Sequence, residues 1–271
     1  MSNALPPVLV GFDASADAVR AADWGAAVAA ARPGTALHLV QALSLPPIPM
    51  HATARSAADV LRVHEQEAQA ALEAERDRRS AAGLAVEIHL RRWPPAETVL
   101  EHADASGAGL IVVGQRGSAT SRVLLGSVSG KVARSARVPV VVIRGAGGAV
   151  PARRVLLAAD GSPSCLAAAA AVATWLPESR VTAVRVLEPG ETAEAGPLVG
   201  ALEASGLGSE RCRLEFAHGP TARTLLDLAR DGDYDLVAAG RRGLSEWEGL
   251  LTGAVSEKLL LLAPCPILVA H

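Results

Sequence analysis

The sequence predicts an α/β protein made of two tandem domains, each a doubly wound parallel sheet with helices on both faces. Two observations predict this class. An internal repeat spans most of the 271 residues, and short apolar runs alternate with longer helical patterns inside each copy. Half of the residues are hydrophobic, so each copy can bury a core of its own.

The repeat consists of four segments that recur in the same order in both halves. They are Asp13-Ala-Ser15 with Asp160-Gly-Ser162, Gly114-Gln-Arg-Gly117 with Gly240-Arg-Arg-Gly243, Gly126-Ser-Val-Ser-Gly-Lys131 with Gly253-Ala-Val-Ser-Glu-Lys258, and Val138-Pro139 with Cys265-Pro266. Both lysines of the chain fall on equivalent positions. We therefore predict domains over residues 1–146 and 152–271, joined by a glycine-rich linker within residues 144–151.

The first copy shows the alternation most clearly. Ser15 or Asp17 caps its first helix, Pro33-Gly34 follows the end of that helix, and the proline-rich residues 43–53 predict a loop. The predicted strands are residues 8–12, 36–42, 85–91, 110–113 and 138–143, and the predicted helices are residues 15–31, 57–82, 95–106 and 127–136. Strands that alternate with helices imply right-handed βαβ units and a parallel sheet.

The second copy is shorter. Asp13 and Asp160 are 147 residues apart, whereas Gly114 and Gly240 are 126 apart, so 21 residues are missing between the first and fourth strands. Residues 188–197 are rich in turn formers. We predict that the long second helix is absent from this copy and that a short helix near residues 198–205 takes its place.

Composition excludes several classes of function. The 26 basic and 28 acidic residues nearly balance, which excludes the basic surface of a nucleic-acid-binding protein. We find no apolar run of membrane-spanning length and no signal-peptide pattern, so we expect a cytoplasmic protein. Cys165, Cys212 and Cys265 form no CxxC pair, and the seven histidines show no metal-ligand spacing, so we predict no metal site.

The residues that carry chemistry are expected where two strands end. Open parallel sheets bind ligands beyond the carboxyl ends of their strands, where the strand order reverses. Asp13 follows the first strand, and Gly114 and Gly117 follow the fourth and lead to Gly126-Ser127 at a helix start. Glycines and a helix N-terminus suit phosphate, and an aspartate suits a ribose or a base amino group. The glycines are equally compatible with ordinary turns.

The same set recurs in the second half as Asp160, Gly240, Gly243 and Gly253. With the prolines before the last strand of each copy, these motifs make the chain resemble the universal stress protein family, as a tandem member. The resemblance implies five-stranded sheets of order 3-2-1-4-5, pairing through the last strands and, in some members, ATP binding through Gly-x2-Gly-x9-Gly-Ser/Thr.

By resemblance, one nucleotide site falls in each copy. In the first copy its residues are Asp13, Ala42, Val113, Gly114, Gly117, Gly126 and Ser127. In the second they are Asp160, Val186, Ala239, Gly240, Gly243, Gly253 and Ala254. Both copies depart from the ATP-binding pattern: eight residues rather than nine separate Gly117 from Gly126, and Ala254 replaces the hydroxyl residue. Because a lost hydroxyl costs less than a displaced loop, we predict fuller occupancy of the second copy.

We find no signature of an enzyme: GxSxG, HxGH and GxGxxG after the first strand are all missing. The leading hypothesis is a non-enzymatic stress-response protein that binds ATP, with or without Mg²⁺, in one or both domains; slow ATP hydrolysis is compatible with it. The alternative is a nucleotide-free platform for dimerisation or partner binding. We predict an intrachain pseudo-dimer joined along the last strands, residues 138–143 and 266–270, compatible with further homodimer formation. We expect neither nucleic acid nor a membrane as partner.

Overall fold

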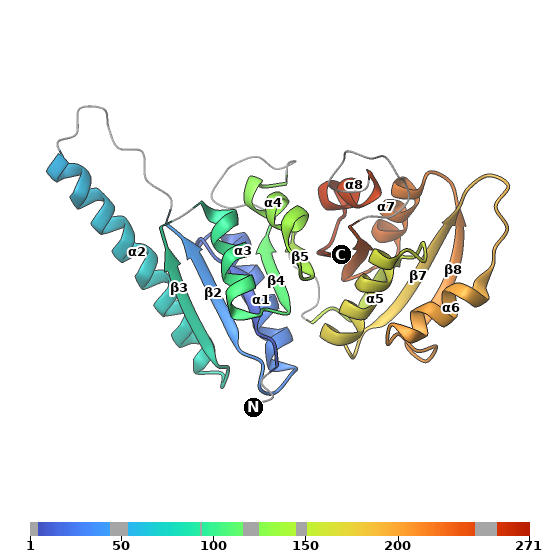
Figure 1. Ribbon diagram of the computed structural model, residues 1–271, viewed down its shortest axis with the longest axis horizontal. Coiled ribbons are helices and arrows are strands. Elements are labelled where there is room, and N and C mark those ends of the chain that lie inside the picture. The colour runs from blue at the N-terminus through green and yellow to red at the C-terminus, as the bar shows by residue number, and fades with distance from the viewer. Residues whose placement is uncertain (1–4, 44–53, 93, 116–124, 145–150, 242–253) are drawn as a thin grey trace. The chain divides into compact units, whose positions relative to one another are not determined.

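The computed structural model describes residues 5–43, 54–92, 94–115, 125–144, 151–241 and 254–271, and strands alternate with helices within each repeat (Figure 1). The first repeat contains β1 (Val8–Gly11), α1 (Ala16–Ala30), β2 (Leu37–Ala42), α2 (Ala54–Ser80), β3 (Val86–Arg91), α3 (Pro95–Ser106), β4 (Leu110–Gly114), α4 (Ser127–Ser135) and β5 (Val140–Ile143). The second contains β6 (Arg154–Ala158), α5 (Pro163–Trp175), β7 (Arg180–Leu187), α6 (Ala195–Ala204), β8 (Cys212–His218), α7 (Thr221–Asp231), β9 (Leu236–Gly240), α8 (Ala254–Leu262) and β10 (Ile267–Ala270).

Every helix and strand expected in the first repeat is therefore present, and the largest shift is the start of α2, three residues earlier than predicted. The predicted loop at residues 44–53 lies outside the described residues. Ser15 is the cap of α1, since its side chain accepts a hydrogen bond from the backbone N–H of Ala18 at 3.2 Å. Asp17 lies in the first turn of that helix instead.

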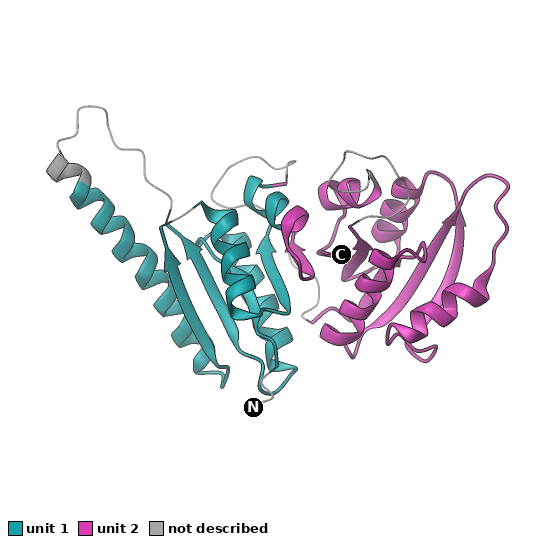
Figure 2. Ribbon diagram, viewed as in Figure 1, with its two compact units in different colours: residues 1–120, 126–132 teal, residues 121–125, 133–271 magenta. Residues whose placement is uncertain are grey.

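The chain divides into two compact units, which Figure 2 shows in teal and magenta. The first unit contains the parallel strands β3-β2-β1-β4. The second contains the parallel strands β8-β7-β6-β9-β10, so the predicted 3-2-1-4-5 order is confirmed there in full. The first repeat follows the same order through its first four strands. This strand order and parallel pairing are those of a doubly wound α/β sheet.

The boundary between the units falls inside α4, so β5 belongs to the second unit. There β5 pairs antiparallel with β10, with Val141 opposite Leu268. These are the last strands of the two repeats, and each covers an edge that the other would leave unpaired. The repeat boundaries at 1–146 and 152–271 and the pseudo-dimer as a whole stay predictions, because the compact units divide the chain by contacts rather than by repeat.

The predicted absence of a long helix from the second repeat is confirmed. The helix between the second and third strands has 27 residues in α2 and 10 in α6. The second half of α2 packs on the unit, since Ala68 and Leu72 are buried. In the first half, Val60 and Val63 are 42% and 46% exposed. Figure 1 shows the first half of α2 extending past the end of β3.

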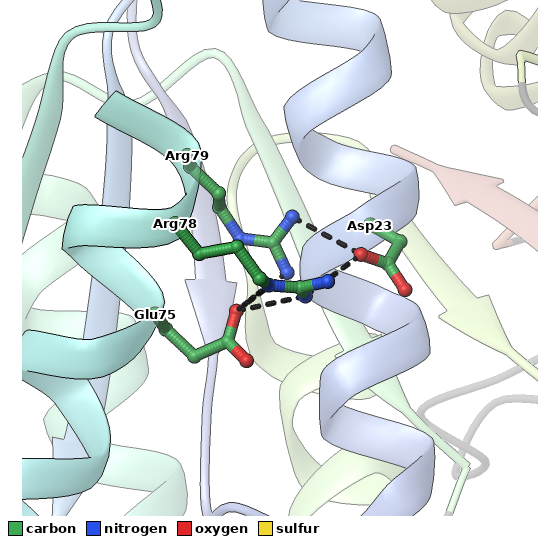
Figure 3. A network of polar contacts seen from close by, with 4 residues as sticks. All are labelled: Asp23, Glu75, Arg78 and Arg79. Atoms are coloured by element: carbon green, nitrogen blue, oxygen red, sulfur yellow. Dashed lines mark hydrogen bonds and ion pairs between the residues drawn. The ribbon is translucent and has the colours of Figure 1, made fainter. Parts of the chain in front are cut away.

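A network of charged side chains fastens the last turns of α2 to α1 (Figure 3). Asp23 of α1 accepts from Arg78 at 3.0 Å and from Arg79 at 3.2 Å, and Glu75 pairs with the same two arginines. The Arg79 side chain is only 7% exposed. Removing a partner of this buried guanidinium therefore costs more than breaking an exposed ion pair.

The core contains two tryptophans and two cysteines. Trp24 and Trp175 are buried, and so are Cys165 and Cys265. Burial raises the pKa of the Cys265 thiol to about 11, which keeps it protonated and unreactive at neutral pH. Arg144, expected to open the linker, is instead buried and donates to the carbonyls of Leu259 and Leu261 near the end of α8.

Candidate functional site

Both repeats form the same hydrogen-bonded turn after their first strand. Oδ1 of Asp13 accepts from the N–H of Ser15 at 3.1 Å, and Oδ1 of Asp160 accepts from Ser162 at 2.9 Å. Each serine then caps the following helix. One oxygen of each aspartate thus stabilises the strand-to-helix turn. This is a structural role, and the sequence motif alone does not distinguish it from ligand binding.

The first glycine after the fourth strand is required by close packing. A Cβ added to Gly114 would lie 2.8 Å from the carbonyl carbon of Asp17 in the first turn of α1. A Cβ added to Gly240 would lie 2.6 Å from the carbonyl carbon of Ser164 in α5. Both distances are too short for any side chain. In each repeat the end of the fourth strand therefore packs directly against the first turn of the helix that follows the first strand.

The start of the fourth helix is tied back to the end of the fourth strand. The hydroxyl of Ser129 donates to the carbonyl of Gln115 at 2.8 Å, and the N–H of Gly126 donates to the same carbonyl. In the second repeat the hydroxyl of Ser256 donates to the carbonyl of Arg241 at 3.0 Å. Sequence reasoning missed these two serines, although they occupy matching places in the third repeated segment.

These contacts gather the predicted residues of the first unit at one edge of the sheet. Gly11 lies opposite Val113 in neighbouring parallel strands, so Asp13 and Gly114 follow them at the same carboxyl edge. Asp13 is exposed after β1, and Ser127 is exposed at the start of α4. A crevice of this type presents backbone N–H groups and a carboxylate to one ligand.

The other predicted residues have different positions. Ala42 ends β2, and Val186 lies in β7 with its side chain buried. The side chains of Val113 and Ala239 are also buried, so only their backbone can face a ligand. Ala254 begins α8. The remaining three, Gly117, Gly243 and Gly253, lie outside the described residues.

The second repeat places a cation beside its aspartate turn. Arg185 of β7 donates to the carbonyl of Asp160 at 2.8 Å and to the Glu191 carboxylate at 2.6 Å. The hydrogen bond from Arg185 lowers the pKa of Glu191. The strand registers put Gln41 at the equivalent place in the first repeat, so this cation is specific to the second.

Two further basic residues do not point to a ligand. Lys131 of α4 is 49% exposed and pairs with Glu97 of α3. The guanidinium of Arg241 donates to the carbonyl of Arg134. Arg116 and Arg242, for which phosphate contact and solvent exposure are both compatible with the sequence, lie outside the described residues.

A groove of about 510 Å³ runs between α7 and α8 in the second unit. It is lined by the basic residues Arg223, Arg230 and Lys258 and by the apolar Leu226 and Leu262. The predicted nucleotide residues are not among those that line it. We take the carboxyl edge, which gathers the predicted residues, as the candidate site, and the groove is a separate feature of the second unit.

The fold and this edge define the class of the protein: a tandem pair of doubly wound α/β domains with the same turn and glycine contact at the carboxyl edge of each sheet. Residues 5–144 and 151–271 each match the universal stress protein family. A universal stress protein of Mycolicibacterium smegmatis is 30% identical over 295 aligned positions, covering 97% of this chain and 96% of the relative. The chain therefore belongs to the universal stress protein family and is a tandem member of it.

Two further relatives agree with this membership. A universal stress protein of Mycobacterium tuberculosis is 28% identical over 298 aligned positions, covering 97% of this chain and 96% of the relative. The crystal structure of a universal stress protein from Archaeoglobus fulgidus superposes with a TM-score of 0.75 at 18% identity, covering 98% of both chains. That likeness concerns the fold alone. Among the described residues, no helix combines the length and apolar character needed to cross a membrane.

Proposed function

We propose that this protein is a non-enzymatic stress-response regulator that binds ATP in the crevice between the β1–α1 turn and the β4–α4 connection, and in its counterpart in the second repeat. The cytoplasm is the compartment that fits this role. The proposal depends mainly on one observation: both repeats keep the glycine contact that brings the two turns together, through Gly114 and Gly240.

The chemistry of the edge supports an anionic ligand with a polar base or sugar. The first N–H groups of a helix have no acceptor within the helix, so the start of α4 offers donors to phosphate oxygens. The exposed Ser127 adds a hydroxyl there. Asp13 supplies a carboxylate at the neighbouring strand end, where a ribose hydroxyl or an adenine amino group would donate to it.

Thermal unfolding with nucleotide tests the proposal directly. A ligand that binds only the native state at 100 times its Kd stabilises that state by about 2.7 kcal/mol. We expect ATP with Mg²⁺ to raise the melting temperature of the full chain and GTP, as a matched control, to raise it much less. Equal melting temperatures with and without millimolar ATP would contradict nucleotide binding.

The alternative function is a nucleotide-free platform for dimerisation or partner binding. The antiparallel pairing of β5 with β10 favours it, because this pairing needs no ligand. The departures from the ATP-binding pattern in both repeats also favour it. An ATP-insensitive melting temperature, together with a stable larger assembly in light scattering, is the result that this alternative predicts.

A further inference from the structure

Three of the seven histidines converge in the first unit. They are His38 of β2, His89 of β3 and His102 of α3, and one ring nitrogen from each lies within 4.8 Å of the other two. Nδ1 of His38 is 3.2 Å from Nε2 of His102, and the ring centres of His89 and His102 are 4.0 Å apart. The residues are far apart in sequence, so no spacing motif predicts the cluster.

The sheet register explains the convergence. His38 lies opposite Glu87, and Val40 lies opposite His89, so His38, Glu87 and His89 share one face of the sheet. Their neighbours Leu37 and Leu39 point to the other face, towards α1, where Gly25 approaches Leu37. Helix α3 packs on β2 and places His102 over the two strand histidines.

The cluster resembles a set of metal donors more than a hydrophobic contact. The Nε2 atom of His89 is buried and has no hydrogen-bond partner among the described residues. Oε2 of Glu87 lies 3.5 Å from that atom and 3.7 Å from Nε2 of His38. Burial lowers the pKa of all three rings, and that of His102 to about 4, so the imidazoles are neutral at physiological pH. Neutral imidazole is the form that binds metal ions.

The second repeat provides an internal comparison. The strand registers and the equivalent starts of α3 and α7 put Thr182, Glu215 and Leu228 at the places of His38, His89 and His102. There Arg213 donates to the Thr182 hydroxyl at 3.2 Å and pairs with Glu215 at 3.0 Å. The same fold thus forms without the histidines, so packing alone does not require them.

We propose that His38, His89 and His102 bind one zinc ion, with a water molecule as the fourth ligand. Glu87, which lies beside the other ring nitrogen of His38, can orient that ring from the outer shell. Imidazole nitrogens suit zinc, and three protein ligands with one further position form a common tetrahedral zinc centre. Zinc–nitrogen bonds of about 2.0–2.1 Å place tetrahedral nitrogens about 3.3 Å apart. Nδ1 of His38 and Nε2 of His102, 3.2 Å apart, already meet this value, and the donor nitrogen of His89 lies within 4.8 Å of the other two. This proposal is independent of nucleotide binding.

Calorimetric titration of Zn²⁺ into the chelator-stripped full chain tests the site. We expect one ion per chain, and with Co²⁺ as probe we expect the intense visible absorption of a tetrahedral complex. His102→Leu and His38→Thr copy residues that the second repeat accommodates. Each should weaken binding at least as much as loss of an outer-shell contact, which costs about 10–100-fold. His218→Gln, an exposed histidine of β8, is the matched control and should bind as the original chain does.

Circular dichroism establishes whether each variant is folded before titration. His89→Gln changes a partly exposed ring and serves as a further variant if His38→Thr does not fold. The proposal is overturned if the original chain binds no Zn²⁺ at a stoichiometric level. It is overturned equally if folded His102→Leu and His89→Gln bind as tightly as the original chain does, because the ion would then lie elsewhere.

Discussion

The two repeats agree at the carboxyl edge of their sheets and differ on the faces that surround it. Both close the turn after the first strand with an aspartate and a capping serine, and both bring a glycine against the first turn of the next helix. On the helix α3 face, however, one repeat has a histidine cluster and the other has none. The two repeats therefore share a steric constraint at this edge, whereas the residues on the surrounding faces differ between them.

The space between the third and fourth helices shows the same divergence. In the first repeat Glu97 of α3 pairs with Lys131 of α4. The corresponding residues of the second repeat, Arg223 of α7 and Lys258 of α8, carry like charges and line the groove there. The change from Glu97 to Arg223 thus exchanges an attraction for a repulsion, and Arg223 pairs instead with Asp227 of its own helix.

The glycine contacts should produce the largest effects. We expect Gly114→Ala and Gly240→Ala each to destabilise the protein by about 1–3 kcal/mol, because the new methyl group meets the backbone of the facing helix. Gly200→Ala in α6 is the control, since nothing lies within 4 Å of an added Cβ and alanine favours a helix. Urea unfolding measures both. A neutral Gly114→Ala alongside a damaging Gly240→Ala would break the equivalence of the two edges.

The histidine cluster should make the metal-free first unit sensitive to acid. Burial lowers the pKa of His102 to about 4, and the charges of His89, His38 and Arg91 act in the same direction against that of Glu87. Between about pH 6.5 and 4 the unfolded chain therefore binds a proton that the folded chain does not. Stability should fall as pH decreases through this window.

The matched variant sharpens this prediction. His102→Leu removes the group with the largest shift and copies Leu228 of the second repeat, so its stability should fall less steeply with acid. Unfolding of both proteins in the presence of a chelator, followed from pH 7.5 to 4.5, provides the comparison. Parallel curves for the two proteins would contradict a role of His102 in acid sensitivity.

Local sequence predicted the elements well because each one carries its own signal. Ser15 caps α1, and the 21-residue deficit correctly predicted the short α6. The family and the strand order were also correct. The histidine cluster was missed because His38, His89 and His102 meet only through strand register and helix packing, which spacing does not encode. Arg144 was assigned to the linker for a similar reason: its carbonyl partners lie more than a hundred residues away.

Substitutions in the turn after the first strand should change the stability of the protein by smaller amounts, in opposite directions in the two repeats. Ala14 has a φ of 59°, a left-handed conformation that costs an alanine about 1 kcal/mol, and Gly161 occupies the same place with a φ of 76°. Ala14→Gly should stabilise the protein by about 0.5–1 kcal/mol, and Gly161→Ala should destabilise it by a similar amount. Melting temperatures of the two variants that change in the same direction would show that the turns are not equivalent.

The smallest effect concerns the cation of the second crevice. Glu191 neutralises Arg185, so Glu191→Gln should leave the guanidinium charge uncompensated near the crevice, favour the polyanionic ATP and tighten its binding by about two- to fivefold, as expected of a partly exposed charge. Gln41→Arg in the first repeat is the reciprocal variant. Weaker ATP binding by Glu191→Gln would mean that the pair supports the site rather than competing with it.

Calorimetric titration of ATP into the full chain and into Gly117→Val and Gly243→Val variants tests the central claim, that the repeated edges are nucleotide sites. Sequence comparison of the two motifs predicts fuller occupancy of the second repeat, so Gly243→Val should abolish most of the binding and Gly117→Val should leave most of it. Binding that survives Gly243→Val but disappears with Gly117→Val would reverse this ranking. Binding that persists unchanged when both glycines are replaced would contradict the claim itself.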